Sequence, residues 1–219
     1  MPAINRRLVK AAWIIIISTV VGPAAVALDA ALYGAPPWTG PEAFVANFHA
    51  LQMVPPLFGF ALLAGFIAFV SAALRKAADR NTDVDATSVM LCTAIYGALV
   101  SFNYIANTIF VGQAGPGAEG AVAALSMNNP HSLCWAIEMV AYAFLGIVTW
   151  LLAPAFTDRK WVGALLRGNG VISVISALIT IVDITWMLSP GGLVAYAAWN
   201  LYVVVTMVAV IVTTPREAN

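Results

Sequence analysis

A single glutamate, Glu138, lies inside an apolar segment, residues 131–154, that is long enough to cross a bilayer as a helix. On a helix, His131, Trp135, Glu138 and Tyr142 follow one another at steps of four, three and four, so they share one face. An ionisable side chain at membrane depth is costly and usually faces a bundle interior or a water-filled cavity. We therefore predict that this face forms one wall of a functional site.

Polar side chains recur at a similar depth in the other apolar segments, whose opposite halves are mostly aliphatic. Asp29 is expected late in the first segment and Asp183 past the middle of the fifth. With Glu138, these two acids are the candidate catalytic residues. The candidate substrate-binding residues are His49, Asn103, Tyr104, Asn107, Trp135, Tyr142, Trp186, Tyr196, Trp199 and Asn200. We predict that one cavity collects Asp29, Glu138, Asp183, Asn103, Asn107 and Asn200.

Each candidate also has a structural interpretation, because Asn, Thr, Tyr and buried acids join membrane helices through hydrogen bonds. For a single Asn or Tyr this interpretation is the more common one. For Glu138 and Asp183 the functional interpretation is favoured. The side-chain amide of Asn or Gln would form the same hydrogen bonds at a smaller free-energy cost of burial than a carboxyl group. His49 and His131 lie near segment starts and also suit interfacial or capping roles. These histidines could hold a haem, but the sequence contains no c-type attachment motif. A metal cluster of His and carboxylates is a minority alternative. No cofactor is therefore predicted.

The expected outer half of the chain contains no Lys or Arg and five carboxylates: Asp29, Glu42, Glu119, Glu138 and Asp183. Without a fixed cation, such a site suits phosphate or carboxylate ligands poorly. Carboxylates among Trp and Tyr rings suit positive charge instead. A low-dielectric setting also favours the neutral, proton-donating form of a carboxyl group. The positive charge then belongs to a cationic ligand or to a carbocation formed from a lipophilic substrate.

Two function classes fit these features. The first is a cyclase- or isomerase-like membrane enzyme, in which Glu138 protonates a neutral lipophilic substrate, Asp183 is the partner carboxylate, and aromatic rings stabilise the cationic transition state. The second is a transporter or binding protein for a small cationic or proton-coupled solute. One-sided polarity favours the enzyme, because a carrier should have polar residues that continue to the inner face. No hydrolase, metalloprotease or nucleotide-binding motif is present.

Composition indicates an integral membrane protein: 62% of the 219 residues are hydrophobic, 9% are charged, and the mean hydropathy is +0.90. We predict an all-α fold in one domain, residues 1–219, with a short helix within 112–130 and a kink at Pro55 and Pro56. A signal peptide ending near Ala27 is the weaker alternative for the first segment, because the apolar run continues past it. The six expected membrane-spanning segments are 11–33, 46–74, 86–111, 131–154, 170–188 and 193–212.

The basic residues indicate the orientation, because all ten fall on one side of a six-helix arrangement, and Lys and Arg favour the cytoplasm. Both termini are therefore expected to be cytoplasmic in a multi-pass protein of the cell membrane. The expected partners are the lipid bilayer, a lipophilic or cationic small molecule, and a second copy in a homo-oligomer. The sequence has no basic patch of the kind that binds nucleic acid, so nucleic acid is not an expected partner. Cys92 and Cys134 are not spaced like redox or metal-binding cysteines. The two halves show no convincing internal repeat.

This orientation predicts that cysteines introduced at Thr82 and at Gly117 face opposite sides of the membrane. In a chain whose native Cys92 and Cys134 are replaced, an impermeant thiol reagent added to sealed cells should label the Gly117→Cys protein and spare the Thr82→Cys protein. Permeabilised cells, in which both proteins should react, provide the control. Labelling of both positions from outside would contradict the orientation.

Overall fold

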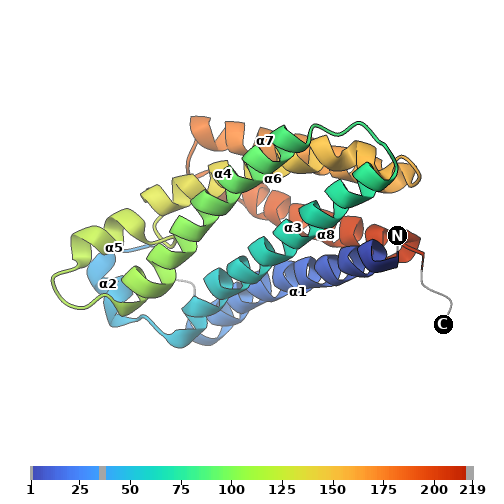
Figure 1. Cartoon of the computed structure of the whole chain (residues 1–219). Helices are drawn as coiled ribbons and strands as arrows, with labels where there is room; N and C mark the ends of the chain where they lie inside the picture. The colour runs from blue at the N-terminus through green and yellow to red at the C-terminus, as the bar shows by residue number, and fades with distance from the viewer. Residues whose placement is uncertain (1, 35–37, 216–219) are drawn as a thin grey trace.

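Long helices joined by short turns make up the computed structural model, which describes residues 2–34 and 38–215 (Figure 1). The helices of this part that are long and apolar enough to cross a membrane are Ala3–Tyr33, Ala50–Asp79, Ala86–Gln113, Leu133–Phe156, Lys160–Val182 and Pro190–Thr213. The prediction of an all-α, multi-pass membrane protein is therefore confirmed by helix length and composition. The cytoplasmic position of the termini stays a prediction, and Arg216 lies outside the described residues.

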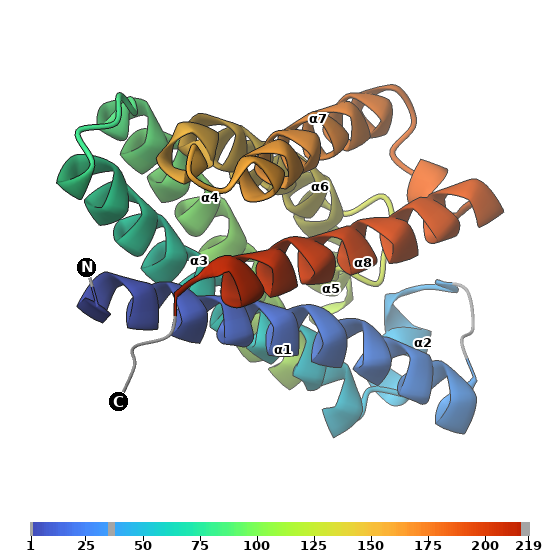
Figure 2. The same cartoon turned by 90° about the vertical axis from the view of Figure 1, so that its right-hand side faces the viewer.

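The spanning helices form one bundle with two short helices at one end (Figures 1 and 2). α1 packs along α3, α6 packs against both α4 and α7, and α8 lies against α1 and α7. The start of α1 and the end of α8 lie together at the opposite end from α2 and α5 (Figure 1). The bounds are α1 Pro2–Tyr33, α2 Pro41–Ala46, α3 Val54–Asp79, α4 Ala86–Ile105, α5 Glu119–Leu125, α6 Leu133–Leu152, α7 Lys160–Val182 and α8 Pro190–Thr213.

Side-chain caps and prolines set several helix starts. Ser132 accepts a hydrogen bond from the Trp135 amide at 3.0 Å at the start of α6, and Ser189 caps α8 in the same way. Pro55 and Pro56 fall in the first turn of α3, where a missing N–H costs nothing. The predicted kink at these prolines is therefore wrong: they begin the helix. The short helix predicted within 112–130 is confirmed as α5.

The fifth spanning helix differs most from the prediction. α7 begins at Lys160, ten residues before the predicted start, because Val162, Leu166 and Asn169 are buried on its inner face. It ends at Val182, so the predicted position of Asp183 within the helix is wrong. The Asp183 carboxylate accepts hydrogen bonds from the Thr185 amide at 2.9 Å and the Thr185 hydroxyl at 2.8 Å. These bonds hold the pKa of the exposed carboxyl below its ordinary value.

Two glycines allow α6 and α7 to approach closely. A Cβ atom on Gly170 would lie 2.9 Å from the Gly146 carbonyl oxygen, and one on Gly146 would overlap the side chain of Ser173. Neither position can therefore carry a larger side chain without separating the helices. This tight crossing fixes the α6 side chains of the site relative to α7.

An ionic network around Asp158 joins the helix ends near the termini. The Asp158 carboxylate contacts Lys76 Nζ at 2.8 Å, Arg80 Nη1 at 2.7 Å and Arg159 Nε at 3.3 Å. Arg159 also donates to the Thr214 hydroxyl at 2.8 Å. Burial alone would raise the pKa of Asp158, but hydrogen bonds from Lys76 and Arg80 outweigh it, so the pKa lies below its ordinary value. The network therefore ties α3 and the end of α8 to the turn before α7.

Replacing Asp158 with Asn should destabilise the protein, because Lys76, whose side chain is only 3% exposed, loses its charged partner. We expect the free energy of unfolding to fall by about 3 kcal/mol at pH 7. A carboxylate with a lowered pKa stabilises the fold above the ordinary value of 3.8 and loses this effect as the pH falls below it. The difference between wild type and Asp158→Asn should therefore shrink as the pH is lowered through that range.

Thermal unfolding in detergent from pH 7 to pH 3 checks this expectation. Asp83→Asn is the matched control, because Asp83 is an exposed acid of the α3–α4 turn. A difference that is small at pH 7, or that grows on acidification, would contradict the role assigned to Asp158.

Candidate functional site

Glu138 is buried at the interface of α6 and α4, with 6% of the residue exposed. Its Oε2 accepts a hydrogen bond from Asn103 Nδ2 at 2.9 Å, and its Oε1 accepts one from Tyr104 Oη at 2.9 Å. Asn103 Nδ2 also donates to the Cys134 carbonyl oxygen at 2.8 Å. Two successive residues of α4 thus bind both oxygens of one carboxyl group on α6.

Two further tyrosines surround this carboxyl group. Tyr142 lies one turn after Glu138 on α6, and its Oη is 3.3 Å from that of Tyr104. The ring of the fully buried Tyr96 meets the Tyr142 ring edge-on, with centroids 5.9 Å apart. We call Glu138, Asn103, Tyr104, Tyr142 and Tyr96 the Glu138 cluster. The Tyr96 hydroxyl and Asn103 Oδ1 are buried without a hydrogen-bond partner of ordinary geometry, so the cluster can accept further hydrogen bonds.

α3 closes the cluster on another side through a glycine. Any Cβ atom on Gly59 would overlap the ring of Tyr104, so only glycine allows the ring to reach Glu138. Phe60, the next residue, meets the same ring edge-on at 5.4 Å between centroids. The position of the Tyr104 hydroxyl therefore depends on contacts with α3 as well as α6.

The partners of Glu138 are neutral. The ion pairs found among the described residues place no Lys, Arg or His against its carboxyl group. A tyrosine hydroxyl can donate to a carboxylate or accept from a carboxylic acid, so the same contacts accommodate either protonation state. The arrangement can therefore gain or lose a proton without separating a fixed ion pair.

Asp29 and His49 form a separate pair towards the α2 end of the bundle. Asp29 Oδ1 lies 3.0 Å from His49 Nε2, although this contact does not have the geometry of a hydrogen bond. The Tyr33 ring lies against the imidazole, with centroids 4.0 Å apart. None of these contacts involves the Glu138 cluster, so Asp29 belongs to a different site from the one predicted.

The six polar residues predicted to share one cavity do not come together in this structure. Asn103 bonds to Glu138, and Asn107 donates to the Asn103 carbonyl oxygen at 2.9 Å, but the other three residues lie elsewhere. Asp183 is exposed in the turn after α7, where water solvates its charge. Asn200 donates to the Tyr196 carbonyl oxygen of its own helix at 2.8 Å, and Tyr196 is 41% exposed. Short polar side chains near helix ends satisfy themselves locally rather than across the bundle.

Other predicted site residues fasten loops. Asn107 donates to the Leu125 carbonyl oxygen at 3.2 Å and accepts from the Met127 amide at 2.9 Å, so it holds the segment after α5. Trp135 donates to the Ile184 carbonyl oxygen at 2.8 Å, which binds α6 to the turn after α7. Within that turn, the Trp186 indole donates to the hydroxyl of Thr180 at 2.8 Å.

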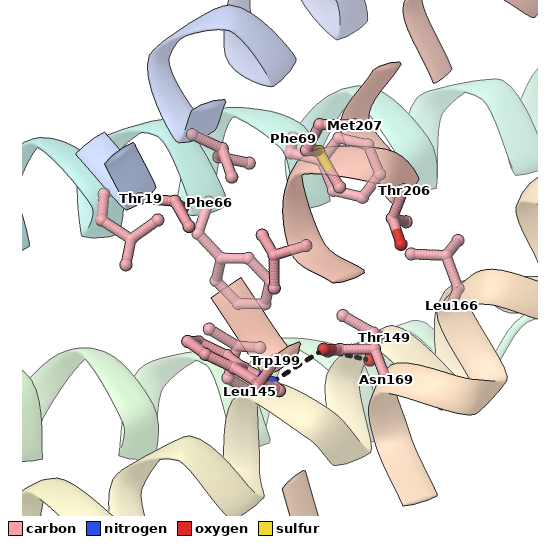
Figure 3. A pocket seen from close by; sticks show the side chains of 13 residues that line it. Thr19, Phe66, Phe69, Leu145, Thr149, Leu166, Asn169, Trp199, Thr206 and Met207 are labelled. Carbon is pink, nitrogen blue, oxygen red and sulfur yellow. Dashed lines mark hydrogen bonds between the residues drawn. The ribbon is translucent and has the colours of Figure 1, made fainter. Parts of the chain in front are cut away.

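A small cavity of about 30 Å³ lies among α1, α3, α6, α7 and α8 (Figure 3). Asn169 on its wall donates to the Thr149 hydroxyl at 3.1 Å and accepts from Trp199 Nε1 at 3.1 Å. The Trp199 ring also meets Tyr142 edge-on, with centroids 5.2 Å apart. Trp199 is therefore a shared wall between this cavity and the Glu138 cluster.

Tyr96, Asn169 and the threonines near this cavity are not among the residues predicted from the sequence. Tyr96 lies in an apolar run, where a tyrosine resembles an ordinary core residue. Asn169 falls before the predicted start of its helix, and the nearby threonines are scattered among aliphatic residues. The available signal was the spacing of Asn169 and Ser173, which places both on one face of α7 towards Trp199.

Asn103→Ala should leave the Glu138 carboxyl group and the Cys134 carbonyl oxygen each short of a buried donor. We expect the free energy of unfolding to fall by about 2–4 kcal/mol. Asn200→Ala is the control, because the Asn200 side chain bonds only to a carbonyl oxygen of its own helix. It should change the free energy of unfolding by at most about 0.5 kcal/mol. Thermal unfolding of the purified proteins compares them, and equal effects would show that Asn103 has no special part in the cluster.

Comparison with known proteins assigns no function to the chain. No family model matches it, and neither the curated proteins nor the solved structures contain a significant match. Among the described residues, no group of three His, Cys, Asp or Glu side chains is arranged to hold a metal ion. The function must therefore be inferred from the geometry of the chain itself.

Proposed function

We propose that this chain is a multi-pass protein of the cell membrane that carries a small solute together with a proton, which binds at Glu138. The observation that carries the proposal is the burial of this carboxyl group among neutral hydrogen-bonding partners, two of them on α4. An acid in lipid surroundings that served only to join helices would be costly, because an amide forms comparable bonds without a charge. A proton-binding role explains why a carboxyl group stands there.

The hydroxyl groups around Glu138 supply a route for the proton. With Glu138 ionised, Tyr104 donates to it and Tyr142 can donate to Tyr104, since these oxygens are 2.9 Å and 3.3 Å apart respectively. A hydroxyl group can accept a proton on one side while it releases its own on the other. A proton that reaches Tyr142 can thus protonate Glu138, and reversal of the same steps releases it.

Polar side chains also continue beyond the Glu138 cluster. The cavity behind Trp199 includes Thr149 and Asn169, which lie in the halves of α6 and α7 nearer the termini. In the sequence, those halves are mostly aliphatic, which favours an enzyme, because a carrier should be polar along its depth. The presence of these two polar side chains in that half of the bundle is what favours transport over catalysis.

The cyclase- or isomerase-like enzyme is the second candidate. It is favoured by the edge-on contact of Tyr142 with Trp199, because aromatic rings near a buried acid would stabilise a cationic transition state. Against it, Asn103 and Tyr104 bond to both oxygens of Glu138, and the predicted partner carboxylate, Asp183, is exposed and bonded to Thr185 in the turn after α7. A different base would have to serve this reaction.

Glu138→Gln tests the transport proposal, because it keeps the side chain's size and most of its bonding but removes the exchangeable proton. The full-length protein is reconstituted in liposomes that contain a pH-sensitive dye, and a potassium diffusion potential drives protons inward. In the absence of solute the carrier should still cycle with the proton alone, so wild type should acidify the lumen, whereas Glu138→Gln should match protein-free liposomes. Size exclusion in detergent verifies that both proteins are folded.

Glu119→Gln makes the same substitution in α5, outside the spanning helices, and should leave proton flux unchanged. Infrared spectra recorded across a pH titration should contain a carboxyl signal that disappears in Glu138→Gln and persists in Glu119→Gln. Proton flux in Glu138→Gln equal to that of wild type would refute the proposal, whatever the solute.

A further inference from the structure

The Glu138 cluster contains one hydroxyl group that has no hydrogen bond. Tyr96 on α4 is fully buried, and its Oη makes no hydrogen bond of ordinary geometry with the described residues. The hydroxyl groups of Tyr104 and Tyr142 lie 3.3 Å apart, and that of Tyr104 also donates to Glu138 at 2.9 Å. A buried hydroxyl group without a partner costs free energy, so its presence among bonded neighbours calls for a physical reason.

Tyr96 lies beside the end of this row of hydroxyl groups. Its ring meets the ring of Tyr142 edge-on, with centroids 5.9 Å apart, and the two hydroxyl groups are close enough to interact electrostatically. The ring of Tyr96 also packs edge-on against Phe66 of α3, with centroids 5.4 Å apart. The buried hydroxyl group of Tyr96 is thus held next to the hydroxyl group of Tyr142, from which hydrogen bonds lead to Glu138.

The groups around the carboxyl group of Glu138 include no fixed cation. In the part of the chain that the structure describes, the titratable groups that interact with it are Tyr96 and Tyr104 on α4, Cys134 and Tyr142 on α6, and Tyr196 on α8. The α3 residues packed against Tyr104 are Gly59 and Phe60, which do not titrate. The ionised form of Glu138 is therefore stabilised by hydrogen-bond donors and not by an ion pair.

We infer that Tyr96 is the last donor of a chain of hydroxyl groups that stabilises the ionised form of Glu138. In that form Tyr104 donates to Glu138, and Tyr142 donates to Tyr104. The oxygen of Tyr142 is then free to accept a hydrogen bond from Tyr96. Each bond polarises the next, so the charge of the acid is felt along the whole chain.

Tyr96 is a positioning residue in this arrangement, because it acts on Glu138 through two other hydroxyl groups and does not carry the proton itself. Its effect differs between the two forms of the acid. A hydrogen-bond chain that ends on a charged group is stronger than one that ends on a neutral group. When Glu138 is protonated, the chain attracts its last donor less strongly, and the hydroxyl group of Tyr96 can stay without a bond.

This chain sets how tightly Glu138 holds its proton, an assignment that rests on the proposed function. A carrier has to bind the proton on one side of the membrane and release it on the other. Burial favours the neutral form of an acid, whereas hydrogen bonds to the charged form oppose that effect. Loss of the last donor should therefore keep Glu138 protonated to a higher pH.

Tyr96→Phe removes the hydroxyl group and keeps the ring between Phe66 and Tyr142. The infrared carboxyl signal of the full-length protein, assigned to Glu138 by its loss in Glu138→Gln, gives the pH at which the acid is half protonated. We expect this midpoint to rise by about 0.5–1 pH unit, because bonds to a charged group are stronger than bonds between neutral groups. An unmoved or lowered midpoint would overturn the inference.

Tyr202→Phe is the matched control, because it removes a tyrosine hydroxyl group that lies outside the Glu138 cluster and donates to the Leu165 carbonyl oxygen at 3.0 Å. It should lower the Tm and leave the midpoint of Glu138 where it is in wild type. Equal shifts of the midpoint in both variants would show that any lost tyrosine hydroxyl group has this effect, which would refute the specific role of Tyr96.

A second variant tests the chain in the opposite direction and does not depend on the folding of Tyr96→Phe. Incorporation of 3-fluorotyrosine at position 96 keeps the ring and the hydroxyl group but makes the hydroxyl group more acidic, and so a stronger donor. The midpoint of Glu138 should then fall below that of wild type. A midpoint equal to that of wild type, or higher, would contradict the chain.

The proton-flux assay separates this inference from the proposed function. The pH dependence of flux in Tyr96→Phe should shift in the same direction as the infrared midpoint. Flux abolished in Glu138→Gln, together with an unmoved midpoint in Tyr96→Phe, would refute the chain and leave the proposed function intact. Flux that persists in Glu138→Gln, together with a raised midpoint in Tyr96→Phe, would refute the proposed function and leave the chain intact.

Discussion

The burial of one carboxyl group in an apolar bundle is the constraint on which the α4–α6 interface depends. Glu138 can lie there only because Asn103 and Tyr104 replace the water it loses, and both must come from adjacent positions of α4. Tyr104 in turn requires a glycine at position 59, since any side chain there would occupy the space of its ring. Three helices are thus placed relative to one another by the hydrogen-bonding needs of one acid.

The two ends of the bundle handle charge in opposite ways. Near the termini, Asp158 is surrounded by Lys76, Arg80 and Arg159, so charge is neutralised by ion pairs at the edge of the spanning region. At Glu138 the partners are neutral, and the charge can be removed by adding a proton. An ion-pair network resists a change of protonation, so the Asp158 network is suited to fastening helices together. A cluster of neutral donors permits such a change, so the Glu138 cluster is suited to binding a proton.

Hydropathy alone was sufficient to predict the spanning helices, because their length and apolarity are properties of each segment. Glu138 could be singled out because a charged residue inside an apolar segment is visible in that segment alone. Asn103 and Tyr104 could be identified because they are expected at the same membrane depth as Glu138. Asp183 was misplaced because a local bond to Thr185 ended α7 before it, and such turn chemistry competes with a helical pattern that looks continuous. The contacts of Tyr96 and the cavity could not be predicted, since they depend on how five helices pack and not on any one sequence pattern.

The position of Trp199 explains how the Glu138 cluster and the cavity can be adjacent yet separate. Its ring stands between Tyr142 on α6 and the cavity wall, and its indole nitrogen is bonded to Asn169 on α7. α6 and α7 approach closely at Gly146 and Gly170. A small displacement of α8 relative to this pair would therefore break the indole bond and withdraw the ring from Tyr142. If Glu138 carries a proton as proposed, the barrier to that proton would then depend on the packing of α8, most of whose spanning window is not buried.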